Sequence, residues 1–429
     1  SLVFGVRYDW FDSSDSPTYN QNFSDSNGIR NDATVDGLDI LQPRIGFTWG
    51  IRDDLQLRGG LGLYSGGNPN VWISNSYSND GVTNVQVDER YSGLSVFDGG
   101  IPVTGSRPGY DIPQELYDEV ANTTADNASN SRLALIDPNF KLPSDWKLAL
   151  GATWDMPGGV QMDIDWLHSR SSDPAMYVDL SQEIVGYTSA GYPIYDYTNG
   201  RDNYMLTNSK HNASSDVFSL IFTKDFENGL DMSLGYAYTQ AEDVSPMTSS
   251  TAGSNFDNVS LTDINNPKPG TSNYEVPHRF TLRTSYGHEF FGDYTTRFTL
   301  LGYTKEGQPQ SYVMGGSDLE GDGFFGRHLL YVPTGAGDPN VVFADGFDTA
   351  AFNDWVKKEG LKSGMQERNA QHAKWSTRFD LRIDQELPLI GQSRARLYVK
   401  VYNLGNLIDD KWGHVNDAEF FSVQVVDSS

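Results

Sequence analysis

The chain has no cysteine, which excludes disulfides, thiolate metal sites and cysteine nucleophiles. It also has no run of about 18 consecutive apolar residues, so no transmembrane helix is expected. Membrane-barrel strands give a much weaker signal, so a membrane location stays open. Basic residues are scarce, with 31 Lys plus Arg against 57 Asp plus Glu and a net charge of −26. Nucleic acid is therefore not an expected partner, because phosphate binding needs a basic face.

Catalytic motifs are missing as well. The sequence contains no His-Glu-x-x-His and no Gly-x-Ser-x-Gly, and its seven histidines are scattered. Residues 144–147 match Ser-x-x-Lys, but they stand where a strand begins and lack the companion motifs. The Gly-rich residues 58–67 follow a strand pattern, and no helix follows to hold a phosphate. The sequence therefore predicts a protein that is not an enzyme and needs no cofactor.

Alternation of apolar and polar residues is the main signal in the chain. In residues 41–64, apolar side chains occupy every second position on both sides of residues 52–54, and the positions between them hold Arg, Thr, Gln and Gly. This period of two predicts a hairpin with one apolar and one polar face. Hydrophobic content is only 38%, yet aromatic residues reach 13%, which fits strands joined by polar loops.

The same pattern recurs along the whole chain and predicts about twelve strands of about ten residues. The runs are 2–10, 45–51, 55–63, 146–156, 160–166, 218–222, 230–239, 279–286, 298–300, 378–384, 396–401 and 421–426. The connections between them alternate strictly in length. Short connections lie at 52–54, 157–159, 227–229, 289–293 and 388–392, and long ones at 12–41, 65–144, 171–214, 240–276 and 305–375.

This alternation predicts an all-β, antiparallel up-and-down transmembrane β-barrel. Tilted strands of about ten residues span a bilayer, and such barrels have short periplasmic turns and long extracellular loops. The apolar face then meets lipid, and the polar face lines the lumen. We expect lumen arginines to pair with carboxylates such as Asp380 and Asp384, or with a plug. In the alternative, a soluble β-sandwich, the apolar face forms the core.

The five long loops are acidic and contain two expected helices. They carry 36 Asp plus Glu against 15 Lys plus Arg, a net charge of −21 out of −26. This charge fits exposed, soluble loops, and in a second interpretation it binds divalent cations or steers cationic ligands. Residues 112–122 and 348–360 have helical spacing, and Asp348 is the expected N-cap of the second helix.

Several stretches, in order along nearly the whole chain, resemble the barrel of TonB-dependent receptors. The likeness is to the Oar-like group, whose members have a carboxypeptidase-regulatory-like N-terminal domain. The stretches are 41–49, 57–81, 276–280, 329–335, 380–388 and 402–413. The resemblance implies import of a bulky ligand, energised from the inner membrane, through a barrel of ~22 strands around a plugged lumen. The chain departs from the family at Arg327-His328, where Asn-Asp is usual.

The resemblance also sets the expected organisation of the chain. Residues 1–429 form one outer-membrane β-barrel portion, about half of the complete barrel. The plug domain and the segment that contacts TonB are expected to precede residue 1, and the final strands are expected to follow. Membrane lipid, the plug domain, TonB and an unknown peptide, glycan or metal chelate are the implied partners. The expected location is the bacterial outer membrane.

Two groups of residues are candidate sites. Asn68, Asn70, Trp72, Asn75 and Tyr77 follow an outgoing strand, where amides and aromatic rings suit a sugar or peptide. The alternative is an ordered loop that caps the mouth or packs on the aromatic belt.

The second group is Asp318, Glu320 and Asp322, which alternate before Gly323 as at the start of a calcium loop. The twelfth position is Leu329 instead of Glu, so an acidic Gly-rich turn is the alternative.

For the whole chain, two interpretations remain open beside the receptor: a passive porin or adhesin barrel, and a soluble extracellular β-rich binding protein.

Overall fold

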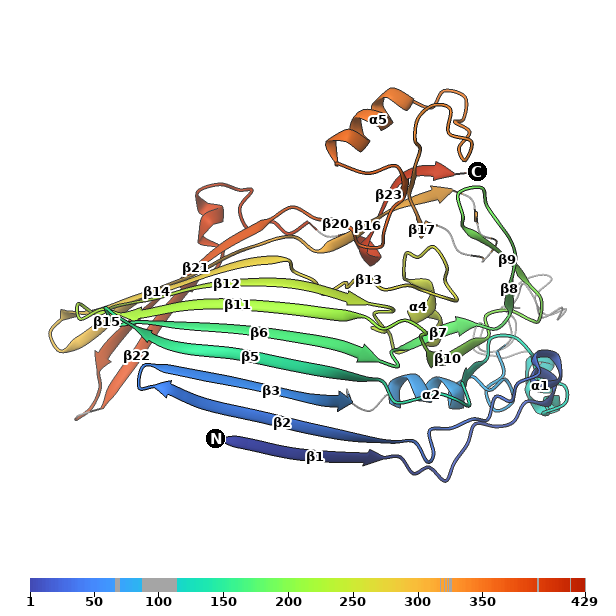
Figure 1. Ribbon diagram of the computed structural model, residues 1–429, viewed down its shortest axis with the longest axis horizontal. Coiled ribbons are helices and arrows are strands. Elements are labelled where there is room, and N and C mark those ends of the chain that lie inside the picture. Colours follow the sequence, from blue (N-terminus) through green and yellow to red (C-terminus); the bar gives the residue numbers. More distant parts are fainter. Residues whose placement is uncertain are drawn as a thin grey trace, which may run out of the picture.

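A computed structural model describes residues 1–65, 70–86, 114–316, 318–319, 321, 323, 326–391, 393–416 and 418–428. Its main feature is a single antiparallel meander in which eleven strands follow one another in chain order (Figure 1). They are β1 (Leu2–Trp10), β2 (Asp39–Arg52), β3 (Leu55–Ser65), β5 (Ser144–Met156), β6 (Val160–Ser172), β11 (Ser214–Asp225), β12 (Leu230–Asp243), β14 (His278–Phe291), β15 (Tyr294–Lys305), β21 (Ser376–Pro388) and β22 (Arg394–Val401). The two-residue β13 (Gly270–Thr271) pairs with β12 and completes a sheet of twelve strands.

The connections confirm the alternation that the sequence predicts. Tight turns join β2 to β3, β5 to β6, β11 to β12, β14 to β15 and β21 to β22, and all lie at one end of the sheet, on the left in Figure 1. Gly158 and Gly159 in the β5–β6 turn have φ of 86° and 69°, a backbone conformation that glycine adopts without strain. The five long connections leave from the opposite end.

Each face of the sheet carries the same kind of side chain from strand to strand. One ladder row joins uncharged side chains on nine successive strands: Trp49, Leu57, Ala152, Ile164, Leu220, Tyr236, Phe280, Thr304 and Thr377. The neighbouring positions hold charged or small polar residues such as Arg58, Asp165 and Arg283. The sheet therefore has a continuous apolar face and a continuous polar face, as predicted, because its register shifts lie next to two tight turns, at Gly50/Arg52 and between His288 and Phe291.

The sheet is open rather than closed. Within the described part of the chain, β1 pairs with β2 alone and β22 pairs with β21 alone. Phe4 and Val6 of β1 are correspondingly 70% and 71% exposed. An unpaired edge leaves a row of backbone donors and acceptors open to another strand. This arrangement matches the prediction of a partial barrel.

One predicted barrel strand lies elsewhere. The run at 421–426 forms β23 (Ser422–Ser428), which pairs in parallel with β16 (Pro309–Gly316), away from the meander. β16 also pairs with β17 (His328–Leu329) and β20 (Gln371–His372). Phe420 and Phe421 have positive φ and redirect the chain just before β23, and Val423, Val425 and Val426 pack on a separate core around Leu330. Alternation predicted the strand correctly but carried no information about its partner.

The long connections fold into a layer beyond the end of the sheet, here called the loop layer. Its strands are β4 (Ala134–Ile136), β7 (Ala175–Asp179), β8 (Gln182–Tyr187), β9 (Pro193–Tyr197), β10 (Tyr204–Asn208), β18 (Tyr331–Val332) and β19 (Gly364–Met365). Its helices are α1 (Gln21–Asn27), α2 (Asn70–Ser78), α3 (Gln114–Asn122), α4 (Ala252–Asp257) and α5 (Thr349–Lys358). Both expected helices are confirmed as α3 and α5, and Asp348 caps α5 by accepting from the Ala351 N–H at 2.9 Å.

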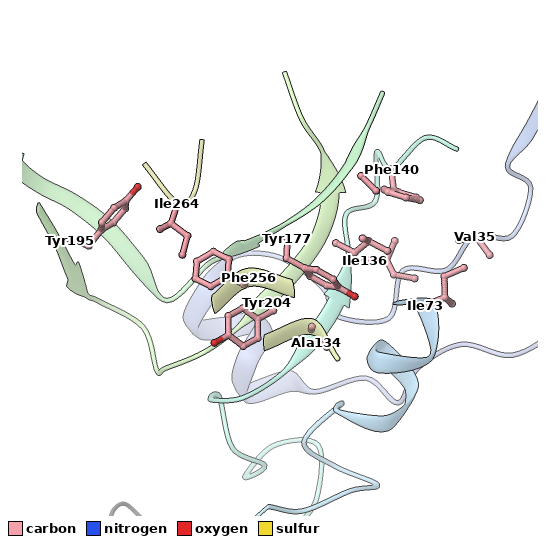
Figure 2. Packing of buried hydrophobic residues seen from close by; sticks show 13 residues of the cluster. Val35, Ile73, Ala134, Ile136, Phe140, Tyr177, Tyr195, Tyr204, Phe256 and Ile264 are labelled. Carbon is pink, nitrogen blue, oxygen red and sulfur yellow. The ribbon is translucent and has the colours of Figure 1, made fainter. Parts of the chain in front are cut away.

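A shared hydrophobic core holds the loop layer together. It contains Val35 from the first loop, Ile73 from the second, Tyr177 from the third and Phe256 from the fourth (Figure 2). Tyr204 packs on Phe256 with ring centroids 5.2 Å apart. Four loops that are far apart in the sequence therefore form one packed unit. Among the described residues, no helix is both long enough and apolar enough to cross a membrane.

Candidate functional site

The polar face of the sheet is lined with arginines that are held by carboxylates. Arg58 on β3 reaches both oxygens of Asp165 on β6 at 2.7 and 2.8 Å. Arg283 and Arg297 share Asp231, at 2.7 and 3.2 Å. Arg58 and Asp165 lie in one ladder row on either side of β5, whereas Asp231 is two residues along β12 from the position opposite Arg283. This face is charged but internally paired.

Further along the same face, β21 and β22 continue the pattern. Arg382 lies 2.5 Å from Asp384, and Arg378 lies 2.8 Å from Asp380. Arg394 and Arg396 both pair with Glu386, at 3.0 and 3.2 Å. The expected pairing of these arginines with Asp380 and Asp384 is confirmed for Arg378 and Arg382.

Several arginines of the polar face contact aromatic rings. Arg44 lies 4.3 Å from the ring centroid of Tyr64, and Arg279 lies 5.5 Å from that of Tyr303. Such contacts between a cation and a ring orient the guanidinium without neutralising its charge. The polar face thus offers fixed, hydrated charges, and its residue types suit contact with a polar surface better than covalent chemistry.

The structure places the candidate mouth residues in and around α2. Asn68 lies outside the described residues, and Asn70 is exposed at the first position of α2. Trp72 packs against the shared core, and its carbonyl accepts from the Tyr177 hydroxyl at 3.3 Å. Tyr77 also packs on this core and donates from its hydroxyl to the Asp15 carbonyl at 2.8 Å.

Asn75 is buried and forms hydrogen bonds with another loop. It is 7% exposed, and its amide nitrogen donates to the Ser250 carbonyl at 2.8 Å while its amide oxygen accepts from the Ala252 N–H at 3.1 Å. The side chain therefore links α2 of the second loop to α4 of the fourth. Trp72, Asn75 and Tyr77 are engaged in packing here, and their proposed contact with a ligand stays a prediction.

The candidate calcium loop is described only in part. The Gly323 N–H donates to the Asp318 carboxylate at 2.8 Å, and Gly321 and Gly323 have positive φ, as in a tight acidic turn. Glu320 and Asp322 lie outside the described residues. Within the described residues, no group of three or more His, Asp or Glu is placed to hold a metal ion. Calcium binding at this loop stays a prediction.

Sequence reasoning missed one buried and one half-buried carboxylate in the loop layer, Asp179 and Asp257. Asp179 is 2% exposed and accepts from the N–H groups of Ser181 and Asn203 at 2.8 and 3.0 Å. Burial raises its pKa to about 6, partly offset by these hydrogen bonds. Burial likewise raises the pKa of Asp257 to about 7, although Arg327 and the Tyr204 hydroxyl act against the shift. Neither aspartate stands in a motif, so no sequence pattern indicates that its carboxylate is shielded from water.

An open antiparallel meander with an uncharged outer row, a charged opposite face and folded loops at one end defines a β-barrel wall of the outer-membrane type. A family model described as "Outer membrane beta barrel domain" matches residues 2–409. The chain belongs to this family and resides in the bacterial outer membrane. The apolar face is therefore the lipid-facing side and the polar face lines the lumen. This location is incompatible with the alternative of a soluble binding protein.

Solved structures with a similar fold include three transporters. The outer-membrane transporter YddB from Escherichia coli has a TM-score of 0.48 and 11% identity, covering 86% of this chain and 37% of YddB. The copper transporter OprC has a TM-score of 0.40 and 10% identity, with coverage of 94% and 40%. The FrpB iron transporter from Neisseria meningitidis (F5-1 variant, apoprotein form) has a TM-score of 0.41 and 9% identity, with coverage of 94% and 38%. This chain thus spans less than half the length of these transporters. No curated protein matches the sequence.

Proposed function

We propose that this chain is the barrel portion of an outer-membrane receptor that imports a bulky ligand, energised through the TonB system. The observation that carries the proposal is the open eleven-strand wall. Among the described residues its edge strands β1 and β22 are paired on one side only, so further strands can join at both edges. Barrels of 16–18 strands leave an aqueous channel, whereas those of about 22 strands enclose a plug. The ordered stretches similar to the Oar-like group favour the larger, plugged barrel.

The charged lumen wall fits this role. Its arginines are fixed by carboxylates, either across an intervening strand, as for Arg58 with Asp165, or along one strand, as for Arg382 with Asp384. Such a surface presents many polar groups to a plug domain without large unpaired charges. In the full-length protein, a plug domain and a TonB-contacting segment would complete the transporter. The proposal assigns no catalytic role to the chain.

The loop layer is the part of the barrel that meets the ligand first. Four loops share one core, so it presents a folded surface rather than separate flexible segments. Folded, pre-organised loops lose less entropy when a ligand binds. Under this proposal the ligand is a peptide, a glycan or a metal chelate, and Asn70, Trp72 and Tyr77 on α2 are the first residues to test for contact with it.

Ion conductance separates the receptor from a passive porin. The complete protein, encoded by the full reading frame, is inserted into planar bilayers, and the current is recorded under an applied voltage. A plugged receptor is expected to show no steady conductance. A steady, ohmic conductance would instead establish an open pore and overturn the proposal.

Dependence on TonB is tested with the same protein. The periplasmic domain of TonB is added to the purified receptor, and binding is measured by calorimetry. We expect saturable binding that is lost when the segment preceding the plug is deleted. Absence of binding, together with a closed lumen, would favour an adhesin-type barrel.

A further inference from the structure

The lipid-facing side of the sheet carries a groove beneath the loop layer. It has a volume of about 440 Å³ and is lined by thirteen residues of β11, β12, β14, β15 and β21. None of the thirteen is charged. Its size falls within the range of ligand pockets in proteins, roughly 300–1,000 Å³. The groove is therefore an uncharged depression in the lipid-facing surface.

The floor of the groove is formed by Thr304 and Thr377 and, in the adjacent row, by the Phe379 ring, which lies over Gly302. Gly302 stands between Leu282 and Phe379 in one ladder row. A Cβ added to Gly302 would lie 2.5 Å from the Phe379 ring, so this ring covers the glycine. Thr304 and Thr377 belong to the next ladder row, toward the loop end of the sheet. In this row Thr304 stands between Phe280 and Thr377.

The two threonines are suited to a hydrocarbon surrounding. Their hydroxyl oxygens lie 2.8 Å apart, so each hydroxyl has a partner within the protein. An unpaired hydroxyl in hydrocarbon is costly, whereas a paired one is tolerated. The floor of the groove therefore does not require water, although it contains polar residues.

Aromatic residues mark the upper end of the groove. Tyr236 packs on Phe280 with centroids 4.8 Å apart, and Phe280 lies 6.3 Å from Trp375. Trp375 stacks on His278 at 6.2 Å and 10°, and the Tyr236 hydroxyl lies 2.9 Å from His278 Nδ1. Trp and Tyr gather at the membrane–water interface. His278 begins β14 at the loop end, so the groove starts directly below the outer headgroup level.

We propose that this groove is a binding site for one hydrocarbon chain of an outer-leaflet lipid. It is continuous with the lipid-facing surface that the family assignment establishes, and lipid chains are the surrounding medium at that depth. It runs across five strands, roughly 19 Å at about 4.8 Å per strand. Because barrel strands tilt by about 35–45°, a chain lying across them is inclined to the membrane normal.

Retention of this chain depends on packing. A lipid chain is surrounded by apolar groups both in the groove and among other lipids, so the hydrophobic effect does not favour binding. The affinity therefore comes from dispersion contacts with the walls of the groove. Filling the floor should therefore release the lipid without disturbing the lumen or the loop layer. Thr304→Leu with Thr377→Leu fills it and removes both hydroxyls together, so neither is left unpaired.

The test uses the complete protein, purified from outer membranes in mild detergent, with retained lipid counted by native mass spectrometry. The matched control is Thr284→Leu, which makes the same substitution once on the lipid-facing side of β14, opposite Leu300 and outside the groove. We expect wild type and Thr284→Leu to retain one lipid. The double variant should retain it about tenfold less often, equivalent to about 1.4 kcal/mol.

Three results would overturn the proposal. They are equal retention in all three proteins, no retained lipid in wild type, and a dimer that dissociates in the double variant, which would make a second copy of the chain the occupant.

If the double variant does not fold, fluorescence in vesicles provides the decision. The fluorescence contributed by Trp375 is the difference between wild type and Trp375→Phe. Lipids brominated on the acyl chain should quench this contribution more strongly than the fluorescence contributed by Trp166. Trp166 lies on the lipid-facing side at the middle of β6, in the same ladder row as His278. Equal quenching of the two would contradict the proposal.

Discussion

The guanidinium of Arg58 and the carboxylate of Asp165 meet across a strand that lies between them. Arg58 is on β3 and Asp165 on β6, and both are paired in register with Gly151 on β5. Arg58 Nη2 lies 2.7 and 2.8 Å from the two carboxylate oxygens, and its Nη1 donates to the Thr153 hydroxyl at 2.8 Å. The pair passes over the glycine, so the absence of a side chain at position 151 makes this lumen contact possible.

Gly151→Ala is therefore expected to destabilise the barrel. A Cβ at this position would lie 3.0 Å from Arg58 Nε and would also press on the Asp165 carboxylate. Overpacking of this kind typically costs about 1–3 kcal/mol. The measurement is the urea midpoint of the complete protein in detergent, read by heat-modifiable electrophoresis.

Gly50→Ala is the matched control for this variant. Gly50 lies on the same lumen-facing side of β2, and a Cβ there meets no atom within 4 Å. This variant should be neutral, or more stable by up to about 1 kcal/mol, because alanine restricts the unfolded chain. Equal midpoints for the two variants would show that the pair moves aside at no cost.

Arginine scanning on β5 should distinguish the two faces of the sheet. Leu150 is lipid-facing near the middle of the strand, and Ala149 beside it faces the lumen. Leu150→Arg should cost about 2–4 kcal/mol, the range for arginine at the bilayer midplane, and Ala149→Arg should cost far less. The fraction of folded protein in outer membranes measures both, and equal fractions would contradict the assignment of the faces.

Removing the Asn75 amide should separate the second loop from the fourth. Asn75→Ala leaves the Ser250 carbonyl and the Ala252 N–H without this partner, a loss of about 1–3 kcal/mol for buried groups. Hydrogen exchange in α4 should accelerate, while the meander strands stay protected. Asn70→Ala, on the exposed start of α2, is the control. Unchanged exchange in α4 would mean that the shared core alone holds these loops together.

The stability of the loop layer should fall as pH rises from about 4 to 7. Burial raises the pKa of Asp257 from 3.8 to about 7, so in this window the folded state binds more protons than the unfolded state. The slope is at most about 1.4 kcal/mol per pH unit for one proton. Asp257→Asn should flatten this dependence, measured by hydrogen exchange of α4 at pH 5 and pH 8.

Asp196→Asn, at an exposed carboxylate of β9, should keep the wild-type dependence on pH. A steep dependence that persists in Asp257→Asn would assign it to another group, with Asp179 the next candidate because its pKa is about 6.

The strands and the short turns were predictable because both depend on local rules. A period of two fixes which residues share a face, as in the hairpin of β2 and β3, and a Pro-Gly-Gly turn fixes where β5 meets β6. The pairing of Arg378 with Asp380 was also within reach, since the two are two residues apart on one strand. Asp348 as the N-cap of α5 follows from the same kind of local reasoning.

The site residues were harder to predict, because their environment is built from distant segments. The Asn-rich stretch at α2 has the composition of a binding loop, yet Asn75 is buried against a segment 175 residues away. Asp179 and Asp257 occupy unremarkable positions in the sequence but share one layer. No local pattern distinguishes an exposed asparagine or aspartate from a buried one when the burial comes from another loop.

By itself the sequence determined the order of strands, the alternation of short and long connections, and the separation of lipid-facing from lumen-facing residues. Each of these follows from backbone geometry over a few neighbouring residues. The tertiary structure alone decided that β23 joins β16, that four loops share a core around Tyr177 and Phe256, and that a groove opens over Thr304 and Thr377. These features depend on which distant segments come together, and an amphipathic strand or loop pattern is compatible with many partners.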